Sequence, residues 1–225
     1  SKNSQEHERP LHRVTLPEYQ IARVPITNAQ YAFYVAEANV KSPSDWKNNQ
    51  PPKGKENHPV VNVSWHEAIA YCKWLSQKIE RDVRLPSEAE WEKAARGDKD
   101  QREYPWGDKW EDFKCNSNEL GLGDTSPVGL FRSGASPDGV LEMSGNVWEW
   151  TRSLWGKDSS KALAYPYDPN DKTREDLSVP DDVYRVLRGG AFYSEARSAR
   201  CAARYGYHPD DGWNNGFRVV VSPVF

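Results

Sequence analysis

The residue types that most often hold metals or act as nucleophiles are sparse in this chain. Its 225 residues include three cysteines, Cys72, Cys115 and Cys201, and five histidines. The cysteines form no C-x-x-C pair and the histidines no H-x-x-x-H pair, so a zinc site is not indicated. An odd, widely spaced set of cysteines also does not suit a disulfide framework, which leaves the compartment open and favours the cytoplasm. We expect Cys72 to be a buried thiol on a helix.

A second group of residues could recognise a ligand. The segment 191–215 is dense in aromatic side chains and asparagine, separated by small or charged residues. Aromatic rings with a polar tip, together with serine and asparagine, are typical of adaptable recognition surfaces. The alternative is that these rings are core, but the Gly, Pro and Asp residues from Tyr207 to Gly216 favour partly exposed loops. The predicted binding residues are Phe192, Tyr193, Ser194, Glu195, Tyr205, Tyr207, His208, Trp213 and Asn214.

Three helices and several short strands must position these residues. The quartets 27–30, 64–67 and 87–90 each have a hydroxyl residue followed three positions later by Glu or Gln, which predicts a capping box and a helix start. The third helix is expected to end near Gly97. Strands are predicted at 13–16, 19–24, 60–63, 147–151, 184–188 and 217–221, in a small, largely antiparallel sheet. The stretches 98–144 and 156–182 are expected to be ordered loops, braced by buried tryptophans or bound cations.

Composition excludes two classes of partner. The formal net charge is −3 and the basic residues are scattered, so the chain has no electrostatic footprint for nucleic acid. No apolar run approaches the roughly 18 residues that span a bilayer, so membrane insertion is not expected. The length suits one α+β domain over residues 1–225. Met143 is the only methionine, which indicates a module taken from a larger protein and fused there to other domains.

Seven ordered blocks of sequence resemble the formylglycine-generating enzyme (sulfatase-modifying factor) family. They include His58-Pro59-Val60-Val61-Asn62-Val63-Ser64-Trp65, Arg84-Leu85-Pro86-Ser87-Glu88-Ala89-Glu90-Trp91, Gly145-Asn146-Val147-Trp148-Glu149-Trp150, Arg188-Gly189-Gly190 and Gly216-Phe217-Arg218. The resemblance implies a variant of the C-type lectin fold, with small antiparallel sheets, a few helices and long ordered loops. Most of these blocks are expected to be structural, with tryptophans pinning loops and with Arg84 and Arg188 bound to buried carboxylates or carbonyls.

The resemblance also implies a structural calcium ion. The family's ligands correspond here to Glu142, Gly145, Val147 and Glu149, and carboxylate and carbonyl oxygens are what Ca²⁺ prefers. The alternative is that the two glutamates lie at the surface or form salt bridges. A second family site would use Asn116 and Ser117, but the acidic residue expected near Leu120 is absent.

The paired cysteines of the catalytic family members are missing. In those members two thiolates after the Gly-Gly motif bind copper, and hydroxyls do not replace them. Ser194 stands where the first cysteine would be, the second is lost in a shortened segment, and Cys201 matches a third, non-catalytic position. Iron-dependent sulfoxide synthases of the same family need a histidine triad from an extra helical domain, and His7, His12, His58, His66 and His208 are not at ligand spacing.

We therefore interpret the chain as a non-catalytic module that binds an unknown protein or small molecule through residues 191–215. In the variable proteins of diversity-generating retroelements, which the chain also resembles, a similar stretch is mutated to change ligand specificity. The alternative is a metal-dependent oxidase or oxygenase of the formylglycine-generating or sulfoxide-synthase type.

Overall fold

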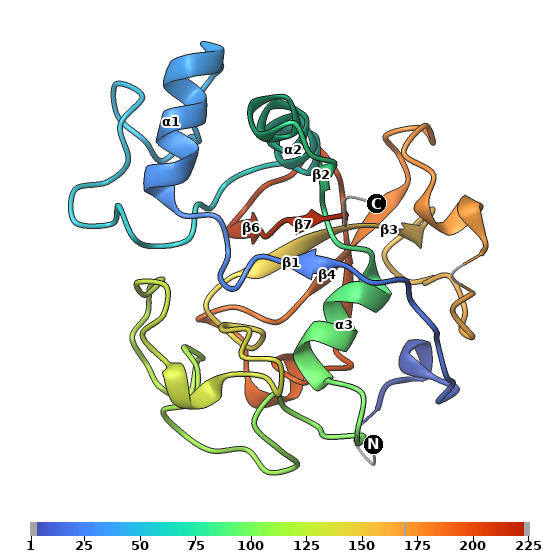
Figure 1. The fold of residues 1–225 in the computed structure, drawn as a ribbon. Helices are drawn as coiled ribbons and strands as arrows, with labels where there is room; N and C mark the ends of the chain where they lie inside the picture. Colours follow the sequence, from blue (N-terminus) through green and yellow to red (C-terminus); the bar gives the residue numbers. More distant parts are fainter. Residues whose placement is uncertain (1–3, 169, 223–225) are drawn as a thin grey trace.

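The computed structural model of the chain describes residues 4–168 and 170–222 (Figure 1). Its α-helices are α1 (Asn28–Ala38), α2 (Trp65–Ile79) and α3 (Glu88–Arg96). Four short 3-10 helices are η1 (Glu6–Glu8), η2 (Arg132–Gly134), η3 (Lys172–Glu175) and η4 (Ala196–Ser198). The strands are β1 (Gln20–Ile21), β2 (Val83–Arg84), β3 (Trp148–Gly156), β4 (Tyr184–Arg188), β5 (Arg204–Tyr207), β6 (Asn215–Phe217) and β7 (Val220–Val221). These elements form the predicted α+β fold.

The three helices begin where the sequence predicts. Thr27, Ser64 and Ser87 each accept a hydrogen bond from the backbone three residues on, and Gln30, Glu67 and Glu90 complete the capping boxes. Because these boxes satisfy backbone donors at helix starts, the entry of the chain into each helix is set locally. The C-cap of α3 is Gly97, as predicted.

The strands form two small sheets. One has the order β1-β7-β2 and is antiparallel, and the other has the order β5-β4-β3-β6. Within the second sheet β3 pairs with β4 antiparallel and with β6 parallel. Residues 13–16 and 60–63 form no strand, so those two predictions were wrong, and the predicted strand 217–221 is divided between β6 and β7. Strands β2 and β5 were missed because two to four residues give too short a pattern to recognise.

The main core lies between α1, α2 and one face of the second sheet. Trp65, Tyr71, Trp150, Leu187 and Phe217 are buried there. The indole N–H of Trp65 donates to the Thr151 carbonyl at 2.9 Å, and that of Trp150 donates to the Val63 carbonyl at 2.8 Å. The tryptophans therefore join the sheet to α2 and to the loop before it, as expected from their residue type.

The opposite face of the same sheet packs against α3, and Figure 1 shows α3 on the other side of the strands from α2. This face carries buried ion pairs. Arg204 Nη2 lies 2.7 Å from Glu88, and Arg188 bonds Glu92. Gly206 lies under the Trp155 ring, where an added Cβ would come within 2.3 Å of Cγ, so only glycine fits.

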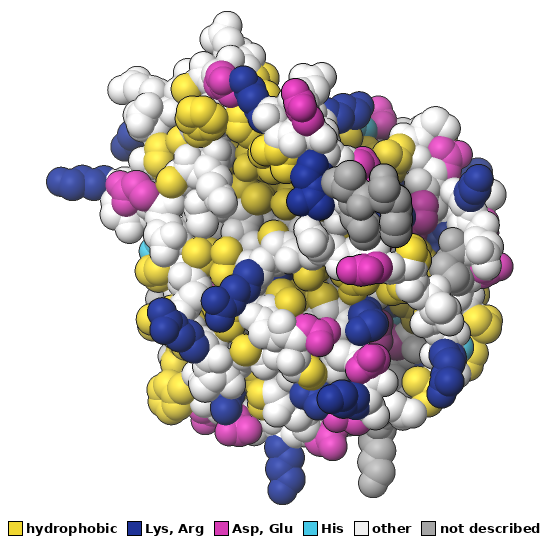
Figure 2. All heavy atoms as spheres, viewed as in Figure 1, with side chains coloured by type: hydrophobic (Ala, Val, Ile, Leu, Met, Phe, Trp, Pro, Cys, Tyr) yellow, Lys and Arg dark blue, Asp and Glu magenta, His cyan; other side chains and the backbone are white. Residues whose placement is uncertain are grey.

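The visible surface mixes charges of both signs, with Lys and Arg interspersed among Asp and Glu (Figure 2). Among the described residues, no helix is both long enough and apolar enough to cross a membrane.

Candidate functional site

Five aromatic side chains from four segments gather at the β5 end of the second sheet. We call Trp148, Tyr193, Tyr205, Tyr207 and Trp213 the aromatic face. The ring centroids of Trp148 and Tyr205 are 6.1 Å apart, those of Tyr205 and Tyr207 are 6.3 Å apart, and those of Tyr193 and Trp213 are 5.3 Å apart. Tyr205 and Tyr207 are also close enough to Tyr193 to affect the pKa of its hydroxyl. The two groups of rings therefore form one surface.

The register of the sheet explains why these rings meet. Tyr205 pairs with Leu187, and Leu187 pairs with the core residue Trp150, so all three side chains are on the same face. Since β5 is the edge strand, the Tyr205 side chain extends past the core towards solvent. Tyr205 is 50% exposed and Trp213 is 58% exposed, and together with the neighbouring rings they form an exposed aromatic patch.

Two tyrosine hydroxyls on this face, those of Tyr193 and Tyr207, have raised pKa values. Burial, helped by the neighbouring hydroxyls of Tyr207 and Tyr205, raises the pKa of Tyr193 to about 12. Burial and a hydrogen bond to Asp211 raise the pKa of Tyr207 to about 12. The Tyr207 hydroxyl already donates its proton to Asp211, whereas the Tyr193 hydroxyl can donate a hydrogen bond to a ligand at neutral pH.

The other predicted binding residues have different surroundings. Phe192 is half-buried against Tyr193, with ring centroids 5.0 Å apart, and Glu195 is exposed and pairs with Arg197 at 3.1 Å. Asn214 has a positive φ of 51° and its N–H donates to Asn62 Oδ1.

Trp148 was not among the predicted binding residues, although its spacing of two from the core residue Trp150 places both on one face of a strand.

Ser194 is part of a turn. It is 8% exposed, and its Oγ accepts a hydrogen bond from the Ala191 N–H at 3.0 Å. Its carbonyl accepts from the Asn118 N–H at 3.0 Å. These contacts give the residue at the position of the first family cysteine a structural role in joining segment 191–215 to the loop that follows Cys115.

Two histidines and three aspartates lie beside the aromatic face. His66 Nε2 is 3.2 Å from Asp181 Oδ1 and 3.5 Å from Asp210 Oδ1, and His208 Nδ1 is 3.9 Å from Asp210 Oδ2. Asp211 accepts a hydrogen bond from the Trp213 N–H at 3.1 Å and is hydrogen-bonded to Tyr207. The prediction included His208 alone from this group: His66 and Asp181 come from segments far away in the sequence, and Asp210 and Asp211 lie in the predicted segment but were not singled out.

The three cysteines lie inside the molecule. Within the described residues none takes part in a disulfide. Cys72 belongs to the main core and Cys201 to a separate cluster with Trp91, so the predictions of a buried thiol and of a core cysteine are confirmed. Burial raises the pKa of all three thiols, to about 12 for Cys115 and Cys201. Thiols of this kind are poor nucleophiles and poor metal ligands.

Two of the predicted calcium ligands, Glu149 and Gly145, already have partners within the chain. The Glu149 carboxylate does not fit, because Arg218 binds both of its oxygens at 2.6 and 2.7 Å and the Trp91 indole donates to it at 2.8 Å. The Gly145 carbonyl accepts from the Val147 N–H at 2.9 Å.

Glu142 has the opposite character. Its Oε1 accepts from the Gly129 N–H at 2.6 Å, whereas its Oε2 is buried without a hydrogen-bond partner in the described chain. Burial raises the pKa of Glu142 to about 7. Asn116 Oδ1 and Ser117 Oγ are likewise buried without partners among the described residues. Glu142 therefore fits a cation, although no cluster of three or more His, Cys, Asp or Glu suited to a metal occurs in that part of the chain. Calcium stays a prediction.

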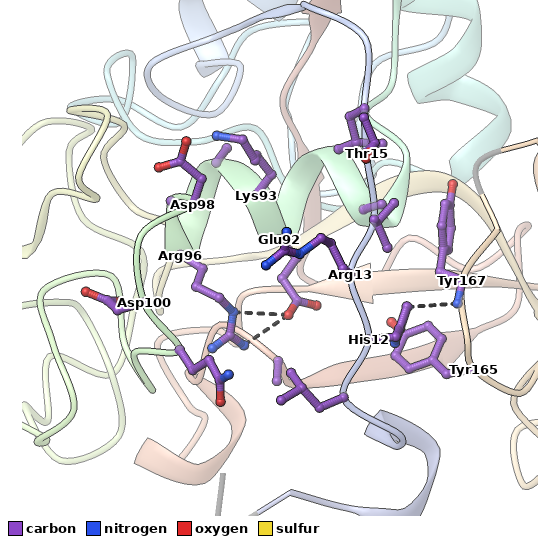
Figure 3. Close-up of a pocket in the computed structure, with 18 of the residues that line it drawn as sticks. His12, Arg13, Thr15, Glu92, Lys93, Arg96, Asp98, Asp100, Tyr165 and Tyr167 are labelled. Atoms are coloured by element: carbon purple, nitrogen blue, oxygen red, sulfur yellow. Dashed lines mark hydrogen bonds and ion pairs between the residues drawn. The ribbon is translucent and has the colours of Figure 1, made fainter.

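A hollow with a volume of about 1490 Å³ lies elsewhere, between residues 8–19 and α3 (Figure 3). Its charged lining is largely paired. Glu92 bonds Arg96 at 2.9 Å, and His12 Nε2 accepts from the Tyr167 N–H at 2.8 Å. The hollow contains none of the predicted binding residues, and its paired lining offers few free groups to a ligand.

Comparison with known proteins identifies the family. The model of the "Sulfatase-modifying factor enzyme 1-like domain" matches residues 1–223. A formylglycine-generating enzyme from Thermomonospora curvata is 35% identical over 201 residues, which cover 80% of this chain and 62% of that protein. The hercynine oxygenase of Mycobacterium tuberculosis is 32% identical, over 92% of this chain and 53% of that protein. The serine/threonine-protein kinase Pkn1 of Chlamydia trachomatis is 34% identical, over 93% of this chain and 34% of that protein. The chain thus spans less than two thirds of the length of each of these relatives.

Solved structures agree. PvdO from Pseudomonas aeruginosa superimposes with a TM-score of 0.77 at 26% identity, covering 98% of this chain and 87% of that one. Treponema denticola variable protein 1 superimposes with a TM-score of 0.68 at 22% identity, covering 91% and 84%. This second likeness shows a shared fold. The predicted resemblance is confirmed, and the chain belongs to the family of sulfatase-modifying factor enzyme 1-like domains.

Proposed function

We propose that this domain is a non-catalytic recognition module that binds a protein or small-molecule ligand through the aromatic face and its neighbours in segment 191–215. The observation that carries the proposal is the exposure of Tyr205 and Trp213 within a continuous aromatic surface. Exposed aromatic clusters on a rigid scaffold are typical of binding sites because they bury a large area at low entropic cost.

The surroundings of Ser194 and of the three cysteines support binding more than catalysis. Ser194 uses its hydroxyl within a turn, and the thiols of Cys72, Cys115 and Cys201 are buried with raised pKa values. A pair of reactive thiolates is what copper-dependent oxidation of a cysteine requires.

The relatives suggest the setting of such a module. This chain is similar to one third of a protein kinase, Pkn1, which suits a domain joined to others in a larger protein. The fold is shared with a variable protein of Treponema denticola. We therefore extend the proposal to a surface whose exposed side chains, such as Tyr205 and Trp213, can be varied on a constant scaffold.

An oxidase or oxygenase is the second candidate, and the relatives named as a formylglycine-generating enzyme and a hercynine oxygenase favour it. Purified protein would be incubated with copper or with ferrous iron, a cysteine-containing sulfatase-type peptide and oxygen. We expect no oxygen uptake above a metal-only control and no formylglycine by mass spectrometry. Turnover would replace the binding proposal with the enzymatic one.

Binding would be tested by photo-crosslinking. A photoreactive benzoylphenylalanine would replace Trp213 or Tyr205, and, as a control, Phe113, an aromatic residue outside the aromatic face that is 73% exposed. In cells of the source organism, we expect Trp213 and Tyr205 probes to capture the same species and the Phe113 probe not to. Capture of equal patterns at all three positions would contradict a specific binding surface.

A further inference from the structure

The chemistry beside the aromatic face points to the kind of ligand that it takes. Asp181, Asp210 and Asp211 form what we call the acidic edge. Asp181 precedes β4, while Asp210 and Asp211 lie in the loop between β5 and β6. The side chains of Asp181 and Asp210 are 67% and 64% exposed. Because Asp211 contacts both Tyr207 and Trp213, this edge is continuous with the aromatic face.

The carboxylates of the acidic edge have little positive charge to balance them. His66 and His208 face Asp181 and Asp210, and an imidazole adds positive charge only when protonated. Arg185 also lies near Asp181, but its side chain is buried and stacks on Trp65 at 4.0 Å. No other Lys or Arg among the described residues forms an ion pair with these three aspartates. The edge therefore presents net negative charge to solvent at neutral pH.

A second observation also indicates a ligand. Asn215 is 2% exposed, and its Nδ2 donor is buried without an acceptor in the described chain. The parallel register pairs Asn215 with Trp148, so the two side chains share one side of the sheet. An unpaired buried donor is unfavourable, and a ligand lying against Trp148 would satisfy it with a carbonyl oxygen once the Asn215 amide turns towards the ligand.

We infer that the ligand is a polypeptide segment with an arginine or lysine side chain, an inference that rests on the proposed function. The basic group contacts the acidic edge and the exposed faces of Tyr205 and Trp213, where a cation is attracted by the ring quadrupole. A neighbouring backbone carbonyl accepts from Asn215 Nδ2. In a peptide, a backbone carbonyl lies close to the basic side chain. A basic peptide can therefore contact Asn215 Nδ2 and the acidic edge together, which an isolated amine cannot.

The test is a selection from a phage-displayed library of random linear peptides on the intact chain. Phage that also bind the Trp213→Ala variant would be removed, so that the remaining peptides depend on the aromatic face. We expect these to be enriched in Arg and Lys. Affinities of synthetic copies would then be measured by fluorescence anisotropy at several salt concentrations.

Two double variants separate specific from general electrostatic attraction. Asp181→Asn with Asp210→Asn removes two charges from the acidic edge, and we expect about a tenfold loss of affinity and a weaker dependence on salt. Glu18→Gln with Asp45→Asn removes two exposed charges elsewhere, and we expect less than a twofold change. Circular dichroism would verify that all variants are folded.

The outcomes distinguish the inference from the proposed function. Trp213-dependent peptides without basic residues, or with affinity unchanged by the loss of Asp181 and Asp210, would overturn the inference and leave the recognition surface in place. An equal loss of affinity in both double variants would also overturn it. A selection that yields no Trp213-dependent peptide would exclude a polypeptide ligand, and the crosslinking experiment would then decide whether the face binds anything else.

Discussion

The carboxylate of Glu149 and the guanidinium of Arg218 form a fully buried pair, with Nε–Oε2 and Nη2–Oε1 distances of 2.6 and 2.7 Å. Arg218 also donates to the carbonyls of Leu141 and Glu142 at 3.0 and 3.1 Å. The pair thereby fixes the turn before β3 against the segment between β6 and β7. A segment whose sequence resembles a metal site thus has an internal cation, supplied by an arginine.

Replacing Glu149 with glutamine is expected to destabilise the domain strongly. The change leaves the Arg218 charge buried without a counter-charge, which typically costs about 3–5 kcal/mol. Urea unfolding followed by tryptophan fluorescence would measure the loss. As a control, Glu37→Gln breaks the exposed Lys78 pair and should cost about 0–1 kcal/mol. Similar losses for the two variants would show that the buried pair has no special role.

Calcium is expected to act through Glu142. We expect calcium to raise the melting temperature above that in chelator for the wild-type chain, because Glu142 Oε2 is a buried oxygen with no partner in the described structure. In Glu142→Gln this calcium effect should disappear. Glu175→Gln is the matched control, since burial raises the pKa of that carboxyl too, and its calcium effect should persist. Equal melting temperatures of the wild type in calcium and chelator would show that the calcium prediction is wrong.

The sequence predicted the local parts of the fold well and the long-range contacts poorly. The capping boxes at Thr27, Ser64 and Ser87 were recognisable because each depends on residues three apart. The family blocks led to the correct fold. By contrast, the partner of Glu149 lies 69 residues away, and Asp181 meets His66 from a distant loop, so neither contact leaves a local pattern. The same limit applies to Trp148, which becomes part of the aromatic face only through pairing of three strands.

The ion pair between Arg84 and Glu90 should make stability depend on acid. Burial alone would raise the pKa of Glu90, but the Arg84 hydrogen bonds and charge outweigh burial and lower it. The stabilisation is therefore complete above the ordinary glutamate pKa and is lost as the pH falls through the lowered value. Glu90→Gln should cost about 1–3 kcal/mol at pH 7 and less in acid.

Glu67→Gln provides the comparison, because Glu67 has the same capping role in α2 and no ion pair is recorded for it among the described residues. Chemical unfolding between about pH 7 and about pH 3 would be compared for both variants and the wild type. If the deficit of Glu90→Gln stays constant across this range, the charge of Glu90 does not contribute to stability.

Restoring one cysteine should not restore copper chemistry. Ser194→Cys puts a thiol at the first family position, but the chain's own cysteines are buried and have raised pKa values. We expect no formylglycine product with copper and a loss of about 1 kcal/mol, because sulfur accepts the Ala191 N–H more weakly than oxygen does. Mass spectrometry of a cysteine-containing peptide would reveal any product, and its appearance would show that one thiol suffices.

Truncating the aromatic face should affect stability far less than truncating the core beneath it. Trp213 is 58% exposed and its ring contacts that of Tyr193, so Trp213→Ala should lower the free energy of unfolding by about 1 kcal/mol. Trp150 is fully buried and donates to the Val63 carbonyl, so Trp150→Ala should cost at least 3–5 kcal/mol, as large core truncations do. Differential scanning calorimetry would compare the two with Tyr205→Ala. If Trp213→Ala and Tyr205→Ala destabilised the domain as much as Trp150→Ala does, these rings would be core residues. Their aromatic surface would then be needed for folding and would not be free to bind a ligand. A small loss of stability would mean that folding does not depend on these two rings. Their exposed aromatic surface would then be available for binding.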